Sequence, residues 1–448
     1  MSMAVSTAKV DITPSPAANP YLGGYGCADV PRQVTTGTPH AEPLYARCVV
    51  FWDDGSPNAI VSADVLAFPR SMHQRIRARV VALSDAWASS DFVLQATHTH
   101  NGPVLVDELN PEIAYNLSDL TLVTSYSAWL ETQIVTLVQT ALGAPPVACT
   151  LDYRIDDEDF AFNREGLPYV ERAVPILTAR RDDGTPVAVL FGYACHPVAA
   201  GTQTQFDGDW PGGACGFIER NLPGCFPLFV QGAAGDQDPN LPRDWATRDA
   251  YANDLGATVV NAIATPGRTV TGPILTSYAE VALPLDVTPT PPNLAAVRAD
   301  YVIRQSGTSL PAWYNRHATA MIAEIDAGTF ATTIPLPIQV WRLQGTPLLR
   351  LVLAGGEVVS GYAVYFRARY GGTDGIWLCG YANEIPAYIA SDELLPPIRT
   401  GGSYDGGWDP DFPGIAGGAM TVYAWLGHFK AGAGGVESTF IDAVTAQL

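Results

Sequence analysis

The chain has 448 residues, of which 47% are hydrophobic and only 16% charged, so it can bury a large core and does not belong to the disordered class. Its formal net charge of −20 argues against nucleic acid or an anionic membrane surface as a partner, because both attract clustered Lys and Arg. The length would permit two or three domains, but α/β enzymes often keep such a length in one, and we expect a single domain over 1–448.

The amino terminus, MSMAVSTAKVDITPSP, has neither the basic flank nor the apolar stretch of a signal peptide. No run reaches the roughly 20 apolar residues of a membrane-spanning helix. Seven cysteines, odd in number, show no CxxC pair and no disulfide spacing. We therefore expect a cytoplasmic protein without a membrane anchor, in which Cys195 is a small buried residue rather than a nucleophile.

The first 68 residues predict loop and sheet, with strands at 45–52 and 59–67. The cluster Gly23-Gly24-Tyr25-Gly26 is not followed by the GKS or GKT of a phosphate-binding loop, and no strand leads into it. We expect it to be a loop that lines a pocket. The spacing of Ile76, Val80, Leu83 and Trp87 predicts a helix over 71–87.

A short apolar strand at 92–94 runs into His98 and His100 and is stopped by the turn-forming Asn101-Gly102-Pro103. Residues i and i+2 of a strand share a face, so the two imidazoles can address one centre if the strand continues through them. Neutral imidazole is a common zinc ligand, and the chain has only seven histidines. A polar pair that caps a strand end would explain the same residues.

Helix and strand patterns then alternate. We expect a helix at 124–142, a strand at 147–155, a hairpin of strands at 174–180 and 187–195, a strand at 226–231 and a helix at 248–264. This alternation predicts the α/β class, with mixed sheets, surrounding helices and an active site at strand ends.

Polar residues follow these strands. His196 ends the hairpin beside Pro197, which halts strand pairing. Asp209 can cap a short helix or orient a metal-binding imidazole. Asp236 and Asp238 follow a buried strand; they can face the site or form an Asx turn. Arg164 lies in an acidic segment, where a surface ion pair with a nearby carboxylate is the simpler interpretation.

The carboxyl-terminal third begins with a strand at 274–283 and a helical insertion at 288–329 that can form part of a substrate rim. A second hairpin at 334–354 leads to Glu357, which we expect at the amino terminus of a helix running to about residue 370. The helix dipole stabilises a carboxylate at that position. The strand at 376–379 leads to a loop with Tyr388. A final helix is expected at 435–447.

In combination and in order, eight segments resemble the amino-terminal catalytic domain of the neutral (alkaline, non-lysosomal) ceramidases, which are zinc-dependent amidases. The segments are VDITP at 10–14, ATHTHNGP at 96–103, Asn163-Arg164, CHPVA at 195–199, GDWPG at 208–212, GDQDPN at 235–240, GGE at 355–357 and YANEIPAYI at 381–389. They span nearly the whole chain. Each motif is weak alone, and the ordered set is fairly specific.

This resemblance implies a Zn²⁺ ion held by His98, His196, Glu357 and Tyr388, and hydrolysis of an amide bond by attack of zinc-bound water. It also implies that His100 and Arg164 contact the substrate carbonyl or its oxyanion, with His100 as an additional ligand left open. For Arg164, the resemblance reverses the surface ion-pair interpretation.

The departures from the family concern the substrate. Ceramidases have a serine where this chain has Asp238, which could act as a general base, bind a cationic or hydroxylated substrate, or accept a structural hydrogen bond. We expect neither the secretory start nor the immunoglobulin-like domain of ceramidases in this protein. We therefore expect a soluble small-molecule amide or ester as substrate. An esterase or lactonase, a two-metal hydrolase recruiting Asp209, Asp236 or Asp238, and a non-catalytic binding protein remain alternatives; the sequence does not fix the oligomeric state.

Overall fold

The protein folds around a mixed sheet of twelve strands that doubles back on itself, so that two parts of the sheet pack face to face. The computed structural model describes residues 3–26, 29–84, 87–308 and 310–448. The first part of the sheet contains β1 (Met3–Asp11), β2 (Tyr45–Asp53), β3 (Ser56–Ala63) and β4 (Phe92–Ala96). The second part contains β5 (Val147–Asp157), β7 (Ala173–Arg180), β8 (Pro186–Tyr193) and β9 (Phe226–Gln231).

Strand β5 joins the two parts, because its first residues pair with β1 and the rest pairs with β7. It also pairs with the start of β11, the long strand that carries the sheet into the carboxyl-terminal third. This third part contains β11 (Arg268–Pro284), β12 (Thr333–Gln344), β13 (Leu349–Ala354) and β15 (Ile376–Cys379). Two short pairs complete the strands: β6 (Ala161–Asn163) with β10 (Gln237–Pro239), and β14 (Glu357–Val358) with β16 (Tyr388–Ile389).

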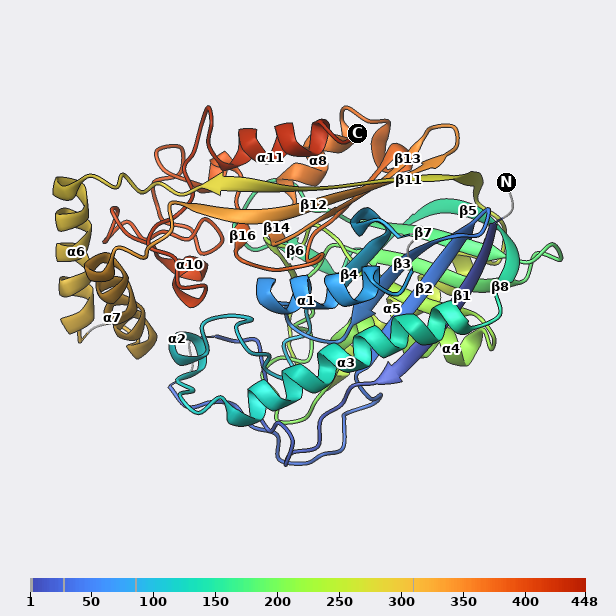
Figure 1. The fold of residues 1–448 in the computed structure, drawn as a ribbon, viewed down its shortest axis with the longest axis horizontal. Helices are drawn as coiled ribbons and strands as arrows, with labels where there is room; N and C mark the ends of the chain where they lie inside the picture. Colours follow the sequence, from blue (N-terminus) through green and yellow to red (C-terminus); the bar gives the residue numbers. More distant parts are fainter. Residues whose placement is uncertain (1–2, 27–28, 85–86, 309) are drawn as a thin grey trace.

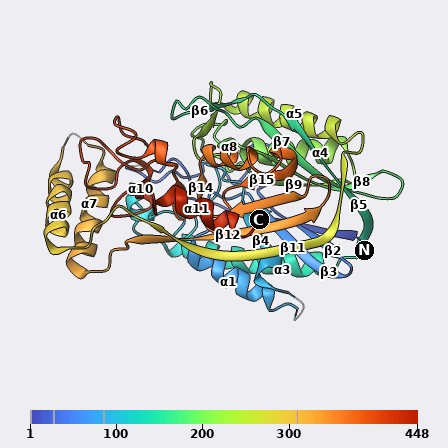
Figure 2. The ribbon, with the colours of Figure 1, turned by 90° about the horizontal axis from the view of Figure 1, so that it is seen from above.

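Helices cover the outer faces, which gives four layers in the order helix, sheet, sheet, helix (Figures 1 and 2). Figure 2 shows the helices of the first part along one edge and those of the second part along the opposite edge. The covering helices are α1 (Arg70–Val81) and α3 (Thr121–Gly143) on the first part, α4 (Asp209–Asn221) and α5 (Trp245–Ala262) on the second, and α8 (Gly361–Arg367) and α11 (Val436–Thr445) on the third.

Strands β2, β3, β8 and β9 are buried on both faces, which explains their nearly continuous apolar sequences. In β2, Val49 points into the core between the sheet parts, whereas Cys48 and Val50 point toward the helices, as the two-residue period of a strand requires. All three side chains are fully buried. The fold class predicted from the sequence is confirmed: the structure is a mixed α/β fold.

The predicted insertion at 288–329 forms two antiparallel helices, α6 (Pro291–Ser306) and α7 (Ala312–Ala327), which stand at one end of the molecule (Figure 1). Short helices α2 (Pro111–Tyr115), α9 (Gly372–Gly375) and α10 (Gly418–Val422) occur in loops. Among the described residues, no helix is both long and apolar enough to cross a membrane.

Three predicted boundaries need correction. Strand β1 precedes the first predicted strand and pairs with β2 along its whole length. The helix expected over 71–87 ends at Val81, and residues 85–86 of that prediction lie outside the described residues. Glu357 does not begin a helix: it lies in β14, and α8 starts at Gly361 because Glu357 pairs with a strand distant in sequence.

Candidate metal centre and active site

Four buried side chains with potential metal-binding atoms meet at the ends of strands: His98 after β4, His196 after β8, Glu357 in β14 and Tyr388 in β16. Glu357 Oε2 lies 3.0 Å from His98 Nε2 and 3.1 Å from His196 Nε2. The hydroxyl of Tyr388 lies 3.2 Å from His196 Nε2. The structure therefore brings together all four residues that the sequence motifs suggested as ligands.

Local backbone geometry places these side chains. Strand β4 ends at Ala96, and His98 adopts a left-handed conformation with φ of 70°, so the strand does not continue through the two histidines as the shared-face argument assumed. The parallel pairing of β14 and β16 sets Glu357 directly beside Tyr388. Gly356, with φ of 76°, permits this approach, because a Cβ there would lie 2.6 Å from the side chain of Ile389.

Hydrogen bonds to the backbone fix the tautomers of the two histidines next to Glu357. His98 Nδ1 lies 2.8 Å from the carbonyl oxygen of Leu66, and His196 Nδ1 lies 2.9 Å from that of Ala234. A carbonyl only accepts, so each Nδ1 carries the proton and donates it. Both Nε2 atoms therefore present a lone pair to Glu357, as histidine ligands of metals do.

His100 has the opposite tautomer. Its Nδ1 accepts a hydrogen bond from the backbone N–H of Tyr25 at 3.3 Å, so the proton of the neutral ring lies on Nε2. Burial lowers the pKa of His100 well below its usual value, which keeps the ring neutral. His98, His100 and His196 form a group close enough to share an ion, and in this tautomer His100 presents an N–H on Nε2.

The donor set fits a small divalent cation. Two imidazole lone pairs point at one carboxylate oxygen, and three acceptors this close repel one another unless a cation or protons lie between them. In a tetrahedral zinc site, ligand atoms about 2.0–2.2 Å from the metal lie about 3.3 Å apart. The separations of 3.0–3.2 Å are close to this value.

Tyrosines surround the carboxylate of Glu357. The hydroxyl of Tyr423 donates to Oε1 at 2.6 Å, and that of Tyr381 donates to Oε2 at 3.3 Å. Burial alone would raise the pKa of Glu357, and positive charge at His98 and His196 lowers it well below its usual range; a cation held between these groups would act in the same direction. These contacts orient an ionised carboxylate toward the two histidines.

Arg164 reaches the same cavity through a chain of ion pairs. Its guanidinium pairs with Asp405 through two nitrogens and donates from Nη1 to Asp238 at 3.2 Å. Burial alone would lower the pKa of Arg164, but Asp405, Tyr388 and Asp238 raise it well above its usual value. The acidic residues near Arg164 in sequence are therefore not its partners.

Asp238 lies between two arginines, because Arg243 Nη2 donates to its second oxygen. Burial alone would raise the pKa of Asp238, but Arg164, His196 and Arg243 lower it below its usual value. A carboxylate held in this way is a weak base. Its contacts are those of a group that positions guanidinium groups.

The other two predicted carboxylates, Asp209 and Asp236, accept hydrogen bonds from loop and backbone groups. Asp209 is the first residue of α4, and it accepts hydrogen bonds from the backbone N–H groups of Ala199 and Ala200, both at 3.1 Å. Among the hydrogen bonds of the described residues, none joins Asp209 to the imidazole of His98 or His196. Asp236 accepts from Asn163 Nδ2 at 2.7 Å and from the backbone N–H of Ser360 at 2.6 Å.

These side chains surround one cavity of about 290 Å³, which we call the central cavity. It is lined by Gly24, Tyr25, Gly26, Leu66, His98, His100, Leu109, Arg164, His196, Val198, Asp238, Arg243, Glu357, Tyr388, Tyr404, Val422 and Tyr423. Gly24, with φ of 72°, packs directly on His100, since a Cβ there would lie 2.6 Å from the His100 Cα. The glycine-rich loop near residue 24 therefore lines a pocket, as its sequence predicted.

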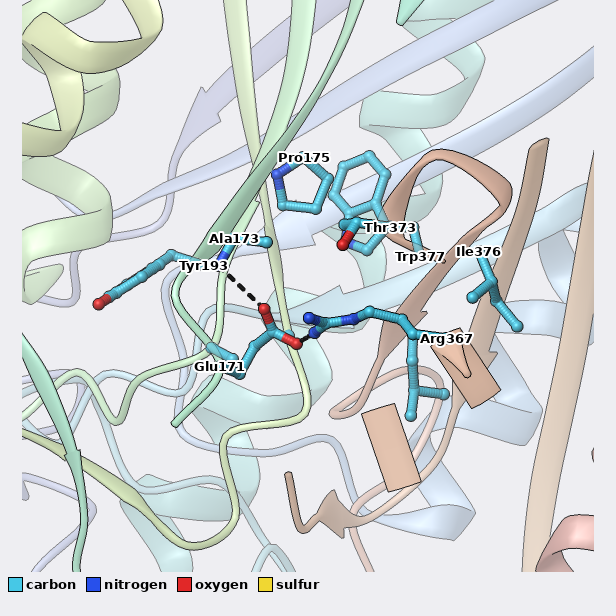
Figure 3. A pocket seen from close by; sticks show the side chains of 11 residues that line it. Glu171, Ala173, Pro175, Tyr193, Arg367, Thr373, Ile376 and Trp377 are labelled. Carbon is cyan, nitrogen blue, oxygen red and sulfur yellow. Dashed lines mark hydrogen bonds and ion pairs between the residues drawn. The ribbon is translucent and has the colours of Figure 1, made fainter. Parts of the chain in front are cut away.

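A separate cavity surrounds the ion pair between Glu171 and Arg367, next to Pro175 and Trp377 (Figure 3). Glu171 Oε1 also accepts from the backbone N–H of Ala173 at 2.9 Å. This cavity encloses about 20 Å³, enough for about one water molecule. It has no room for a substrate.

Five residues of the site were missed by sequence reasoning. Tyr381 lies in a quoted motif and Tyr25 in the glycine cluster, so both had a local signal. Arg243 follows Asp238 closely, but a single arginine has no spacing to interpret. Asp405 and Tyr423 come from a glycine-rich region without periodicity, and only the fold brings them to Arg164 and Glu357.

No protein-family model matches the chain, and no curated protein sequence matches it. Among solved structures, it is similar to neutral ceramidase from Pseudomonas aeruginosa, with a TM-score of 0.67 and 17% identity, over 100% of this chain and 74% of that one. A ceramidase complexed with C2 gives a TM-score of 0.66 and 17% identity, over 95% and 73% of the two chains. The chain therefore has the neutral ceramidase fold, as the order of its motifs predicted.

Proposed function

We propose that the protein is a zinc-dependent hydrolase that cleaves an amide bond of a small soluble substrate. The observation that supports this most directly is the convergence of His98 Nε2, His196 Nε2 and the Glu357 carboxylate, three acceptors with no proton between them. His98, His196, Glu357 and Tyr388 would hold the ion. Zinc bound there would polarise a substrate carbonyl and acidify water.

Other residues around the cavity would stabilise the oxyanion. The Nε2–H of His100, 3.2 Å from His98 Nε2, is fixed by the Tyr25 backbone and can donate to a carbonyl oxygen beside the centre. Arg164 is held in place by Asp405 and Asp238 and adds a positive charge there. Fixed donors and charges of this kind stabilise the oxyanion that forms when a carbonyl is attacked.

Asp238 positions Arg164 and Arg243 in this proposal and does not take the proton of the attacking water. Asp209, Asp236 and Asp238 are each occupied by backbone N–H groups, an amide or arginines, and they do not converge on a second point. This arrangement favours a one-metal centre over the two-metal alternative.

Elemental analysis and turnover, measured on the same samples, test the proposal. We expect about one zinc per chain in the wild type, hydrolysis of at least one compound in a panel of N-acyl amines, and loss of both metal and activity in His196→Ala and Glu357→Gln. The half-buried His40 stacks on Trp245, away from the cavity, so His40→Ala is the matched control that keeps both.

An esterase or lactonase would show itself as turnover of matched esters with none of the amides. Two metals per chain would support the two-metal alternative. Absence of metal from the wild type after zinc is offered, or full activity in a metal-free variant, would contradict the proposal.

A further inference from the structure

One part of the central cavity contains polar groups that the proposed hydrolysis does not use. Tyr25, Asp238 and Arg243 line it together with the apolar Val198. Asp238 Oδ1 lies 3.9 Å from His196 Nδ1, so this wall adjoins the candidate metal centre. A substrate group only a few bonds from the scissile amide would therefore reach it.

Arg243 has unused N–H donors on this wall. Its one hydrogen-bond partner in the described part of the chain is Asp238, which also accepts from Arg164. The Nε–H of Arg243 is buried, and among the described residues it has no partner. The side chain as a whole is 29% exposed. Since a guanidinium has five N–H donors, most of them are left for a ligand.

Tyr25 presents a second unused donor. Its hydroxyl is buried and finds no hydrogen-bond partner within the described ranges. Its backbone is in the left-handed region with φ of 46°, where an aromatic residue is strained. Its N–H holds His100, and its ring packs edge-on against that imidazole at 5.1 Å. A buried hydroxyl without a partner is costly unless a ligand supplies an acceptor.

The charges that line the cavity balance one another. Arg164 and Arg243 contribute two positive charges, and Asp238 and Glu357 contribute two negative ones, so their sum is zero. The whole chain has a net charge of −20. Arg32 has no carboxylate partner among the described residues; it donates to Asn101 and to backbone carbonyls, including that of His100. The cavity is therefore the less acidic region of an acidic molecule.

We propose that Arg243 and the Tyr25 hydroxyl form a carboxylate-binding subsite, and that the substrate has a carboxylate a few bonds from its scissile amide, as in an N-acyl amino acid. The inference rests on the proposed function, since it names the substrate class of the same site. Asp238 then serves to hold Arg243 at the subsite, which accounts for an acidic residue in a pocket that takes an anion.

Non-cleavable probes test the subsite independently of catalysis. The first probe is the ketomethylene analogue of N-hexanoylglycine, in which CH₂ replaces the amide NH, and the second is its carboxamide. By calorimetry we expect the wild type to bind the carboxylate about ten- to a hundredfold more tightly than the carboxamide. Arg243→Gln should reduce this preference to about onefold and Tyr25→Phe by several fold.

Two further variants separate local from general effects. Arg243→Lys keeps the charge and should keep part of the preference, which guards against a folding defect in Arg243→Gln. Arg181 is exposed on the turn between β7 and β8, so Arg181→Gln removes the same charge elsewhere and should leave the preference unchanged. Equal binding of the two probes by the wild type, or an unchanged preference in Arg243→Gln, would overturn the inference.

Turnover then shows on which side of the amide the carboxylate lies. It also separates a failure of the subsite from a failure of the proposed function. Hydrolysis of N-hexanoylglycine places the carboxylate on the amine side, and hydrolysis of N-hexylsuccinamate places it on the acyl side. Selective binding without hydrolysis of any amide would retain the subsite and refute the proposed function. Hydrolysis with preference for an amine-bearing analogue would retain the function and refute the subsite, with Asp238 as the recognition group.

Discussion

Two histidines that share a cavity differ in what they can do, because their hydrogen bonds differ. His98 donates from Nδ1 to the Leu66 carbonyl and offers a lone pair on Nε2. His100 accepts at Nδ1 from the Tyr25 N–H and offers a proton on Nε2. The sequence shows the pair as His-x-His and cannot separate the two roles, since the difference is set by backbone groups from two other loops.

We predict that His100→Gln retains zinc while kcat falls about 10²–10³-fold, because one donor to the oxyanion is lost. His98→Gln, the matched substitution on the same loop, should lose both metal and activity. Zinc content and steady-state kinetics of the two variants provide the check. Loss of zinc from His100→Gln would make His100 a ligand and refute the tautomer argument.

Residue types near strand ends indicate the site well, whereas ion pairs cannot be inferred from neighbouring charges in the sequence. His98 and His196 were found because apolar runs end beside them. The acidic neighbours of Arg164 in sequence favour a surface ion pair, yet its partner Asp405 is distant in sequence and fully buried. Long-range pairs of this kind leave no local pattern.

At the scale of elements, the helical pair α6 and α7 packs in a small hydrophobic cluster, in which Tyr301, Ala318 and Met321 meet Ile415 and Leu426 of the carboxyl-terminal segment. His317 is fully buried beside it and bonds through Nε2 to the Trp425 carbonyl at 3.0 Å. Burial lowers the pKa of His317 to about 3. A buried histidine that must stay neutral makes this hairpin sensitive to acid.

The lowered pKa of His317 fixes the direction in which stability changes with pH. The unfolded chain binds the proton at about pH 6.5 and the folded chain only near pH 3, so the stability from neutral His317 is complete above pH 6.5 and is lost as the pH falls toward 3. We predict that His317→Gln, which keeps a donor but cannot charge, removes up to about 1.4 kcal/mol per pH unit from the pH dependence of unfolding in that window. Denaturant unfolding at several pH values provides the measurement, and identical slopes in both proteins would contradict it.

Long elements were predictable from the sequence, and short ones were not. The apolar runs that became β2, β3, β8 and β9 are buried between layers and have a strong signal. The apolar helical stretch after Glu357 predicts that Glu357 begins a helix. It belongs instead to a two-residue strand whose partner includes Tyr388, so its structure depends on a contact that no local window contains.

At the scale of the whole molecule, the excess of 45 acidic over 25 basic residues places repelling charges on the surface. We predict that raising NaCl from about 10 mM to about 300 mM increases Tm by about 1–3 °C, because salt screens this repulsion. Calorimetric melting at fixed pH provides the check. A Tm that falls or stays constant over this range would show that local ion pairs outweigh the net charge.

The four proposed ligands come from segments spread from residue 98 to residue 388. During synthesis, a ribosome that has released only the first two sheet parts has exposed two histidines but neither Glu357 nor Tyr388, and the carboxyl-terminal third must dock before the set is complete. Bringing such distant residues together is a slow, late event in folding. Tight metal uptake would thus report that the whole chain has finished folding.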